Sequence, residues 1–316
     1  MNKLHTSAAP HINSGATTHN VMRDVAIALL PATIAAIVLF GFQALLIVLV
    51  CVASAVTAEF LFNLVCKKKQ TILDFSAIVT GLILALNLST KVPLWQCALG
   101  SVFAIVVVKC LFGGLGKNIV NPAIGARVFL LIAFGATVTG GANTIFAELE
   151  SAATPLGNGG CLATGDYSLL TLLIGNHGGA IGETCAIALL LGYGYLVYRG
   201  VIKWYVPFAF VATVFVLFFV TTWDIKFATA QVLAGGLLLG AIFMATDYVT
   251  TPLSKLGKVV FCIGCGLITF VIRMQYFGFD GLATYPEGVS IAILFMNLLT
   301  PLIEKWTNPR TLGGVK

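Results

Sequence analysis

Long apolar segments recur along almost the whole chain, and their length limits what the chain can fold into. A membrane-spanning α-helix needs about 20 mostly apolar residues, whereas a strand of a membrane barrel needs only about 10. The sequence has about ten runs of the helical length, each bounded by charged residues, glycine or proline. They lie near residues 25–42, 44–65, 72–88, 93–113, 119–137, 183–199, 205–222, 228–246, 258–275 and 287–304. These runs predict an all-α polytopic membrane protein and exclude a barrel.

Composition supports lipid as the solvent, because 59% of the residues are hydrophobic, 9% are charged and the mean hydropathy is +0.99. The net charge of +6 resides in the loops, so no nucleic-acid partner is expected. The eight cysteines are scattered and indicate no disulfide framework. Cys262 and Cys265 form a CxxC pair inside an apolar run without a second matching pair. Packing is therefore favoured over a metal or redox site, and no metal is expected.

The basic residues are distributed unequally between the two sides of the predicted bundle. If the N-terminus is inside, the inner side holds thirteen Lys or Arg and the outer side three. The inner residues are Lys3, Arg23, Lys67, Lys68, Lys69, Lys117, Arg199, Lys203, Lys255, Lys258, Lys305, Arg310 and Lys316, and the outer ones are Lys91, Lys226 and Arg273. The positive-inside rule then places both termini, residues 1–23 and 306–316, on the cytoplasmic side of the membrane. Residues 1–23 lack the pattern of a signal peptide.

The longest loop, residues 139–182, divides the runs into a first half (24–138) and a second half (183–305) of five each. An odd number per half forces opposite topologies, which predicts an inverted repeat. Weak similarity between Thr80–Leu86 and Gly235–Ala241 agrees, although any two Leu/Gly-rich helices look alike. The dividing loop faces outward and has no Lys or Arg.

Two smaller features refine this picture. The apolar segment Ser168–Ile174 is short and runs into Gly175-Asn176-His177-Gly178-Gly179, so it is predicted to be a re-entrant half-helix or an interfacial segment. Gly236 and Gly240 form a GxxxG pair, which lets another helix approach closely.

Among the charged residues of the predicted spans, three are candidates for a role inside the membrane: Glu59, Lys109 and Arg127. A charge inside a membrane is costly and indicates either a structural ion pair or a role in cofactor or ion binding, and the sequence leaves both open. The topology places all three in the cytoplasmic half, so Glu59 could pair with either cation. Arg127 is the deepest of them.

The segment Gly113-Gly114-Leu115-Gly116-Lys117-Asn118 lacks the spacing of a phosphate-binding loop, and its glycines indicate a tight turn instead. Asn121 and Pro122 follow it. They predict the start of the next helix, with Asn as the cap and Pro at the first helical position.

Several segments together resemble one family, the RnfD/NqrB membrane subunits of ion-translocating electron-transfer complexes, and the compact length is more similar to RnfD. The resemblance covers essentially the whole chain. It is carried by Asp74-Phe75-Ser76-Ala77, Thr80 to Leu86, Lys109 to Ala123, Gly182-Glu183-Thr184 and Met244-Ala245-Thr246-Asp247.

The resemblance implies two flavins and an inverted-repeat fold related to urea and ammonium channels. In the family, a Thr that ends an [ST]-G-A-T sequence carries FMN through a phosphodiester bond made by a flavin transferase. The matching segment is Ser151 to Thr154, with Ala152 where Gly is usual and Glu148 where an upstream Asp is usual. The outer location of this loop fits the outer face on which the family attaches its flavin. A second, noncovalent flavin, riboflavin, is implied within the bundle.

Candidate cofactor-binding residues are therefore Thr154, with Ser151 beside it, and five further polar or glycine positions at helix ends and in spans. A cation near the N1/C2 carbonyl edge of a flavin stabilises the reduced form, which favours Arg127. The others are Asn121, Gly182, Glu183 and Thr184. No residue is predicted to be a catalytic acid, base or nucleophile.

The resulting hypothesis is a subunit that relays electrons through flavins between ferredoxin and NAD, coupled to Na⁺ or H⁺ transport. Its partners would be the other membrane and peripheral subunits, the flavin transferase and the lipid bilayer. Two alternatives remain: an inverted-repeat transporter or channel without a redox cofactor, and a structural membrane subunit without a cofactor.

Overall fold

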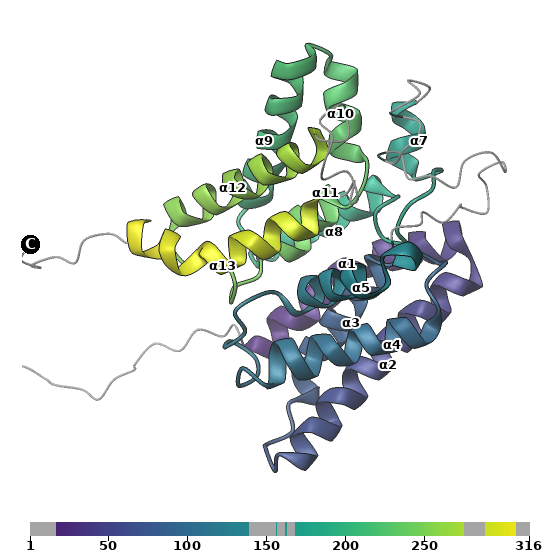
Figure 1. Cartoon of the computed structure of the whole chain (residues 1–316), viewed down its shortest axis with the longest axis vertical. Helices are drawn as coiled ribbons and strands as arrows, with labels where there is room; N and C mark the ends of the chain where they lie inside the picture. The colour runs from purple at the N-terminus through teal and green to yellow at the C-terminus, as the bar shows by residue number, and fades with distance from the viewer. Residues whose placement is uncertain (1–16, 139–155, 157–161, 163–167, 275–287, 308–316) are drawn as a thin grey trace, which may run out of the picture.

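A computed structural model describes residues 17–138, 156, 162, 168–274 and 288–307 of the chain (Figure 1). Within these residues every element is helical. The predicted flavin-attachment residues Ser151 and Thr154 lie outside the described residues.

The first half contains five apolar helices and a short connecting turn. Their bounds are α1 Thr18–Phe40, α2 Phe42–Val65, the 3₁₀ turn η1 Ile72–Asp74, α3 Ser76–Leu86, α4 Leu94–Phe103 continuing as the π-helix η2 Ala104–Cys110, and α5 Pro122–Val138. A short helix, α7 Leu169–Ile174, lies in the loop between the halves, and the helices of the second half follow it. They are α8 Ala186–Tyr198, α9 Tyr205–Thr222, α10 Ile225–Leu233, α11 Leu237–Leu239 with the π-helix η3 Gly240–Met244, α12 Lys255–Met274 and α13 Val289–Thr307.

Five helices in the described part of the chain are long and apolar enough to cross a membrane: α1, α2, α9, α12 and α13. The bent pair of α10 with α11–η3 adds a sixth, and α3, α4–η2, α5 and α8 are shorter apolar helices. The prediction of an all-α polytopic membrane protein is confirmed. Each predicted run contains a helix, but length and composition alone assign only five or six spans, so the count of ten remains a prediction.

One predicted span is not continuous. The run at residues 228–246 breaks between α10 and α11, which meet at an angle of 64°. The cause is local, because Gly235 adopts a φ of +68°, a conformation that favours glycine over every other residue.

At the other end of the chain, α1 begins at Thr18, several residues before the predicted start. There the Thr17 hydroxyl accepts a hydrogen bond from the Asn20 amide at 3.3 Å and caps the helix.

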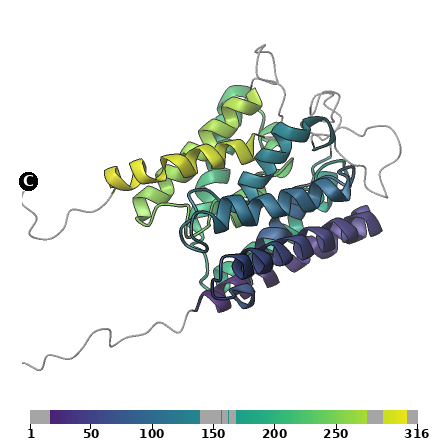
Figure 2. The ribbon, with the colours of Figure 1, turned by 60° about the horizontal axis from the view of Figure 1, so that its bottom comes forward.

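One packing relation is common to the two halves, and the inverted repeat stays a prediction. In the first half α2 packs against α3 and α4, and in the second half the corresponding helix α9 packs against α10 and α12. The halves lie side by side in Figure 1, where α8 contacts α1 and α13 contacts α5. The start of α1 and the end of α13 lie on the same side of the bundle in Figures 1 and 2.

Glycines allow the closest approaches between elements. A Cβ on Gly192 of α8 would lie 2.3 Å from the Ala28 carbonyl oxygen of α1, so no larger residue fits at this contact between the halves. The predicted GxxxG pair also serves packing, although the two glycines receive different neighbours. Gly236 lies against Glu183, and Gly240 lies against Val289 of α13.

Candidate functional site

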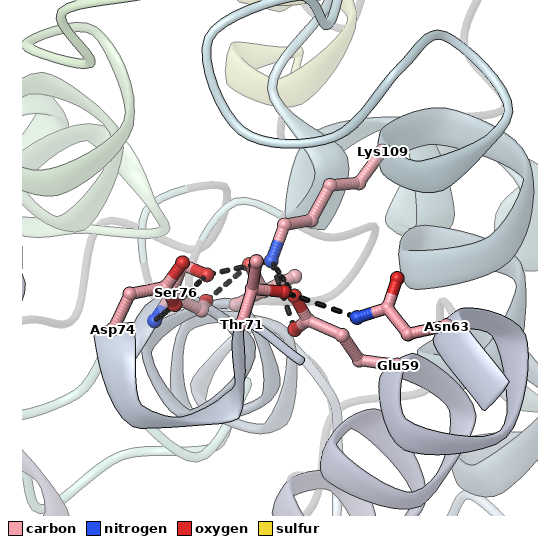
Figure 3. Close-up of polar contacts among 7 residues, drawn as sticks. Glu59, Asn63, Thr71, Asp74, Ser76 and Lys109 are labelled. Atoms are coloured by element: carbon pink, nitrogen blue, oxygen red, sulfur yellow. Dashed lines mark hydrogen bonds and ion pairs between the residues drawn. The ribbon is translucent and has the colours of Figure 1, made fainter. Parts of the chain in front are cut away.

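A buried ion pair joins α2 to the end of η2. Lys109 Nζ lies 2.9 Å from both carboxylate oxygens of Glu59 and donates a third hydrogen bond to Ser76 Oγ at 2.6 Å (Figure 3). Lys109 is 2% exposed and Glu59 1%. Because an ammonium group has three donors, every N–H of Lys109 is used. Of the two cations that Glu59 could have joined, it binds Lys109.

The same network fixes the start of α3. Asp74 Oδ1 accepts from the Ser76 amide at 3.0 Å and from the Ser76 hydroxyl at 2.5 Å. The Thr71 hydroxyl donates to Glu59 at 2.5 Å, and Asn63 donates to Thr71 at 3.1 Å. Figure 3 shows these side chains converging from α2, η1, α3 and η2. The arrangement satisfies the buried charges internally, which favours the structural interpretation of Glu59 and Lys109.

Arg127 takes a different partner. Its Nη1 lies 3.1 Å from Glu183 Oε1 and also donates to Asn87 Oδ1 at the end of α3. Arg127 is 4% exposed and Glu183 2%. The structure thus brings together two predicted site residues from different halves of the chain, while Glu59 belongs to a separate cluster.

Gly182 and Thr184 flank Glu183 and hold its segment in place. The Gly182 amide donates to the Leu86 carbonyl at 2.8 Å, and a Cβ on Gly182 would lie 2.4 Å from Leu86 Cβ. The hydroxyl of Thr184 is buried and has no hydrogen-bond partner in the described structure. Nearby, burial lowers the pKa of His177 from 6.5, so this imidazole is neutral at physiological pH.

One buried cation, Arg273, was not predicted as such. It was counted on the outer side, near the end of the predicted span 258–275, but it lies buried in the last turn of α12 with 1% exposure. Its Nη1 donates to the Gln231 carbonyl at 2.5 Å, and its Nη2 donates to the Ala234 carbonyl at 3.3 Å. Helical spacing could have revealed it, since it continues the buried face of α12. The other buried residues of that face include Cys262, Cys265, Gly266 and Thr269.

Leu156, a residue between the two halves, lies near this arginine. It is 7% exposed. A Cβ on Gly235 would lie 2.7 Å from Leu156 Cδ1 and 3.4 Å from Arg273 Nη2, so both side chains meet at the break between α10 and α11. Leu156 therefore lies in the interior close to a buried positive charge.

Asn121, the remaining predicted site residue, lies elsewhere. Its Oδ1 accepts from the Ala123 amide at 3.0 Å, which confirms that it caps α5 with Pro122 at the first helical position. It also lines a cavity of about 90 Å³ between the two halves. Polar groups gather in this cavity among apolar ones from α1, α3 and η3. They include Thr80, Asn118, Thr246 and Asp247.

Asp247 is the carboxylate of this cavity. It accepts hydrogen bonds from the Val249 amide at 3.3 Å and from the Thr250 hydroxyl at 3.2 Å. Burial raises its pKa above 3.8, while these two hydrogen bonds oppose the rise. The cavity therefore contains a carboxyl group that holds its proton more tightly than an exposed one.

Two further sequence features lie outside these polar clusters. Gly113, Gly114 and Gly116 all have positive φ and form the predicted tight turn. Cys262 and Cys265 are buried, which agrees with packing roles for these cysteines.

The all-α bundle and the buried charges that connect its two halves define a polytopic membrane protein with a polar interior. Within that class the chain belongs to the NQR2, RnfD, RnfE family, whose model matches residues 5–313. The match covers both halves and the loop between them. The family assignment therefore applies to the whole architecture.

Curated relatives match along nearly their entire length. The chain is 43% identical over 321 residues to the D subunit of the Na(+)-translocating ferredoxin:NAD(+) oxidoreductase complex of Acetobacterium woodii, covering 100% of this chain and 98% of that protein. It is 35% identical to the proton-translocating counterpart of Clostridium ljungdahlii, covering 97% and 95%. The D subunit of the ion-translocating oxidoreductase complex of Methanosarcina acetivorans is 32% identical, with 100% and 99% covered.

Proposed function

We propose that this chain is the D subunit of an ion-translocating ferredoxin:NAD⁺ oxidoreductase complex and relays electrons within it. The observation that carries the proposal is the match to relatives of that name over the full length of the chain. The partners are then the other membrane and peripheral subunits of such a complex, in a bacterial inner membrane. Relatives named for Na⁺ and for protons both match, so the coupling ion is either one.

We place the electron carrier on Thr154, as FMN attached by a flavin transferase through a phosphodiester bond, on the outer face. The flavin supplies reversible electron transfer, and the chain supplies position and electrostatics. Two features of the described residues fit such a group. Leu156, two residues after Thr154, is buried beside Arg273, and Arg273 Nε is a buried donor with no partner in the described structure.

A second flavin, riboflavin, belongs in the interior under the same proposal. The cavity between the halves offers an apolar wall and polar groups such as Asn121 and Asp247, as a cofactor site requires. Its volume of about 90 Å³ is below the roughly 300 Å³ at which small-molecule pockets begin. A flavin would therefore need the helices around the cavity to separate.

The test uses the full-length chain, purified from a host that contains the transferase and run on a denaturing gel. Flavin fluorescence that survives denaturation is expected in the wild type and in Thr164→Val, which removes a hydroxyl from the same loop. It should vanish in Thr154→Val. A wild-type band without flavin fluorescence contradicts the covalent FMN. A fluorescent Thr154→Val band means that the FMN is attached to another residue.

A transporter or channel is the second candidate, because the cavity between two inverted halves is where such proteins bind solutes. The same gel separates the candidates, since a transporter carries no covalent flavin. Purified chain that has no flavin and catalyses solute uptake into proteoliposomes would favour the transporter.

A further inference from the structure

Another cavity lies at the end of the bundle where α9 and α12 begin. Its volume is about 100 Å³, and Lys203 and Lys258 line it. Lys203 lies two residues before α9, and Lys258 lies in the first turn of α12. Because each ammonium group sits on a flexible stem, both can reach into this one space. The apolar residues that line this lysine pocket are Val201, Ile202 and Val206.

The hydroxyl groups of the lysine pocket use their protons within the protein. Tyr248 donates to the Val201 carbonyl and so ties the loop after α8 to the loop after η3. Thr246 and Thr251 each donate at 2.6 Å to a backbone carbonyl four residues earlier in the chain. These bonds fix the walls of the pocket. They leave the two lysines as the side chains that can donate hydrogen bonds to a ligand.

The positive charge of the pocket is not balanced within the described structure. Among the described residues, no carboxylate oxygen lies within ion-pair distance of Lys203 or Lys258. Arg199, at the end of α8, is different because it pairs with Asp24 at 3.0 Å. Asp247 lines the adjoining cavity between the halves and not the lysine pocket. The pocket therefore favours an anion from outside the chain.

A phosphate group fits both the charge and the volume of the pocket. About 10–15 Å³ of such volume holds one water, so a space of about 100 Å³ has room for a phosphate group. Lysine binds phosphate as a point charge. Two ammonium groups can therefore donate to different oxygens of one phosphate.

The position of the pocket favours a lipid as the source of this phosphate. Because α9 and α12 are long and apolar enough to cross the membrane, their first turns lie at the level of the lipid headgroups. Trp204, beside Lys203, and Leu256, in the first turn of α12, are exposed, as expected at a lipid–water interface. Basic pockets between membrane helices on the cytoplasmic side bind anionic headgroups. The distribution of Lys and Arg predicts this end of the bundle to be cytoplasmic.

We propose that the lysine pocket binds a phosphate group and takes it from an anionic phospholipid. Lys203 and Lys258 donate to the phosphate oxygens, while Trp204 and Leu256 contact the acyl chains. Soluble phosphate offers the same oxygens without acyl chains, so the two sources differ in affinity. The inference depends neither on the electron carrier nor on the coupling ion.

The test is a titration of the purified full-length chain in detergent with phosphatidylglycerol, read by native mass spectrometry as the fraction that carries a bound lipid. Phosphatidylcholine has the same phosphate beside a positive choline and should bind more weakly. In Lys203→Gln/Lys258→Gln the dissociation constant for phosphatidylglycerol should rise at least about tenfold, because each lysine near an anionic headgroup contributes to binding. Lys203→Arg/Lys258→Arg keeps both charges and should retain the preference for phosphatidylglycerol.

The matched control is Lys67→Gln/Lys69→Gln. These two lysines follow α2, are exposed and lie on the same predicted side of the membrane. The variant removes the same charge from outside the pocket and should bind phosphatidylglycerol as the wild type does. Inorganic phosphate at millimolar concentration should not displace the lipid.

Three results would overturn the proposal. The first is an equal loss of binding in the two glutamine double variants. The second is equal binding of the two lipids by the wild type, which would favour an acidic segment of a partner protein as the occupant. The third is displacement of the lipid by inorganic phosphate, which would make the ligand a soluble anion. If Lys203→Gln/Lys258→Gln does not accumulate, Lys203→Gln alone changes an exposed position and should show part of the loss, whereas wild-type affinity in it contradicts the proposal.

Discussion

Arg127 and Glu183 form a buried ion pair of 3.1 Å although they lie 56 positions apart and in different halves of the chain. A lone charge of either sign in this interior would cost several kcal/mol. Each half therefore supplies the opposite charge that neutralises the buried charge of the other half. The pair explains why the loop between the halves ends in a fixed segment at Gly182 to Thr184, which is tied to the end of α3.

Removal of the Lys109 ammonium should destabilise the first half strongly. Lys109→Met leaves the Glu59 carboxylate buried with only the Thr71 hydroxyl from the network of Figure 3, at an expected cost of about 3–5 kcal/mol. The measurement is thermal unfolding of the purified chain in detergent. The double variant Glu59→Gln/Lys109→Met removes both charges and should recover part of the loss.

The matched control is Arg23→Gln, since Arg23 lies 3.9 Å from Asp24 and its side chain is 46% exposed. Exposed pairs contribute at most about 1 kcal/mol. If Lys109→Met and Arg23→Gln have the same melting temperature, the Glu59–Lys109 pair does not stabilise the fold.

Alanine substitutions at two glycines of α8 should have opposite effects on the stability of the chain. A Cβ at Gly192 would meet the Ala28 carbonyl oxygen at 2.3 Å, whereas a Cβ at Gly194 has nothing within 4 Å. Gly192→Ala should therefore cost about 1–3 kcal/mol by forcing α1 and α8 apart. Gly194→Ala should be neutral or stabilising by up to about 1 kcal/mol, because alanine favours the helix. Comparable melting temperatures for the two variants would refute the close contact between the halves.

The stability of the chain should depend on pH through Asp247. Its folded pKa is raised above 3.8, so its contribution to stability is complete below 3.8 and is lost as the pH rises through the raised pKa. The asparagine side chain in Asp247→Asn is uncharged at every pH, so the variant avoids this loss of stability. The variant should therefore gain stability over the wild type between acid and neutral pH, measured as the difference in melting temperature. A difference that does not change with pH contradicts the raised pKa.

Orientation is testable with a native cysteine. Cys66 follows α2 and is exposed, next to Lys67 on the predicted inner side. In a Cys161→Ser background, a membrane-impermeant maleimide should label Cys66 in inverted vesicles and not in intact cells. Adding Lys226→Cys should introduce a site with the reverse pattern. Labelling of Cys66 from outside the cell would show that the topology is the reverse of the predicted one.

The apolar runs predicted the helices because span length is imposed by the bilayer and is visible in sequence. The break at Gly235 was harder to predict. The Gly235–Gly236 pair was visible, but glycine is common in membrane helices and only the surrounding packing decides whether it bends one. The cap at Asn121 was predicted because capping is a local interaction.

Side-chain pairing could not be obtained from spacing alone. Glu59 had two possible cations, and the choice of Lys109 follows from how η2 packs on α2. Arg127 pairs with Glu183, which the sequence placed at the first position of the predicted span 183–199 with nothing to indicate its partner. Arg273 was missed because a charged side chain near the end of a span ordinarily reaches toward water. Here the carbonyl oxygens of Gln231 and Ala234 at the end of α10 accept its hydrogen bonds instead.

The charge pairs also constrain how the chain is made. Glu59 enters the membrane fifty residues ahead of Lys109, and Arg127 enters 56 residues ahead of Glu183. During synthesis each early charge must wait in or beside the insertion machinery until its partner emerges, since release into lipid alone is costly. A ribosome that stalls within the outer loop leaves Arg127 without its carboxylate. Such a truncated product would carry an intramembrane charge that its missing second half can no longer neutralise.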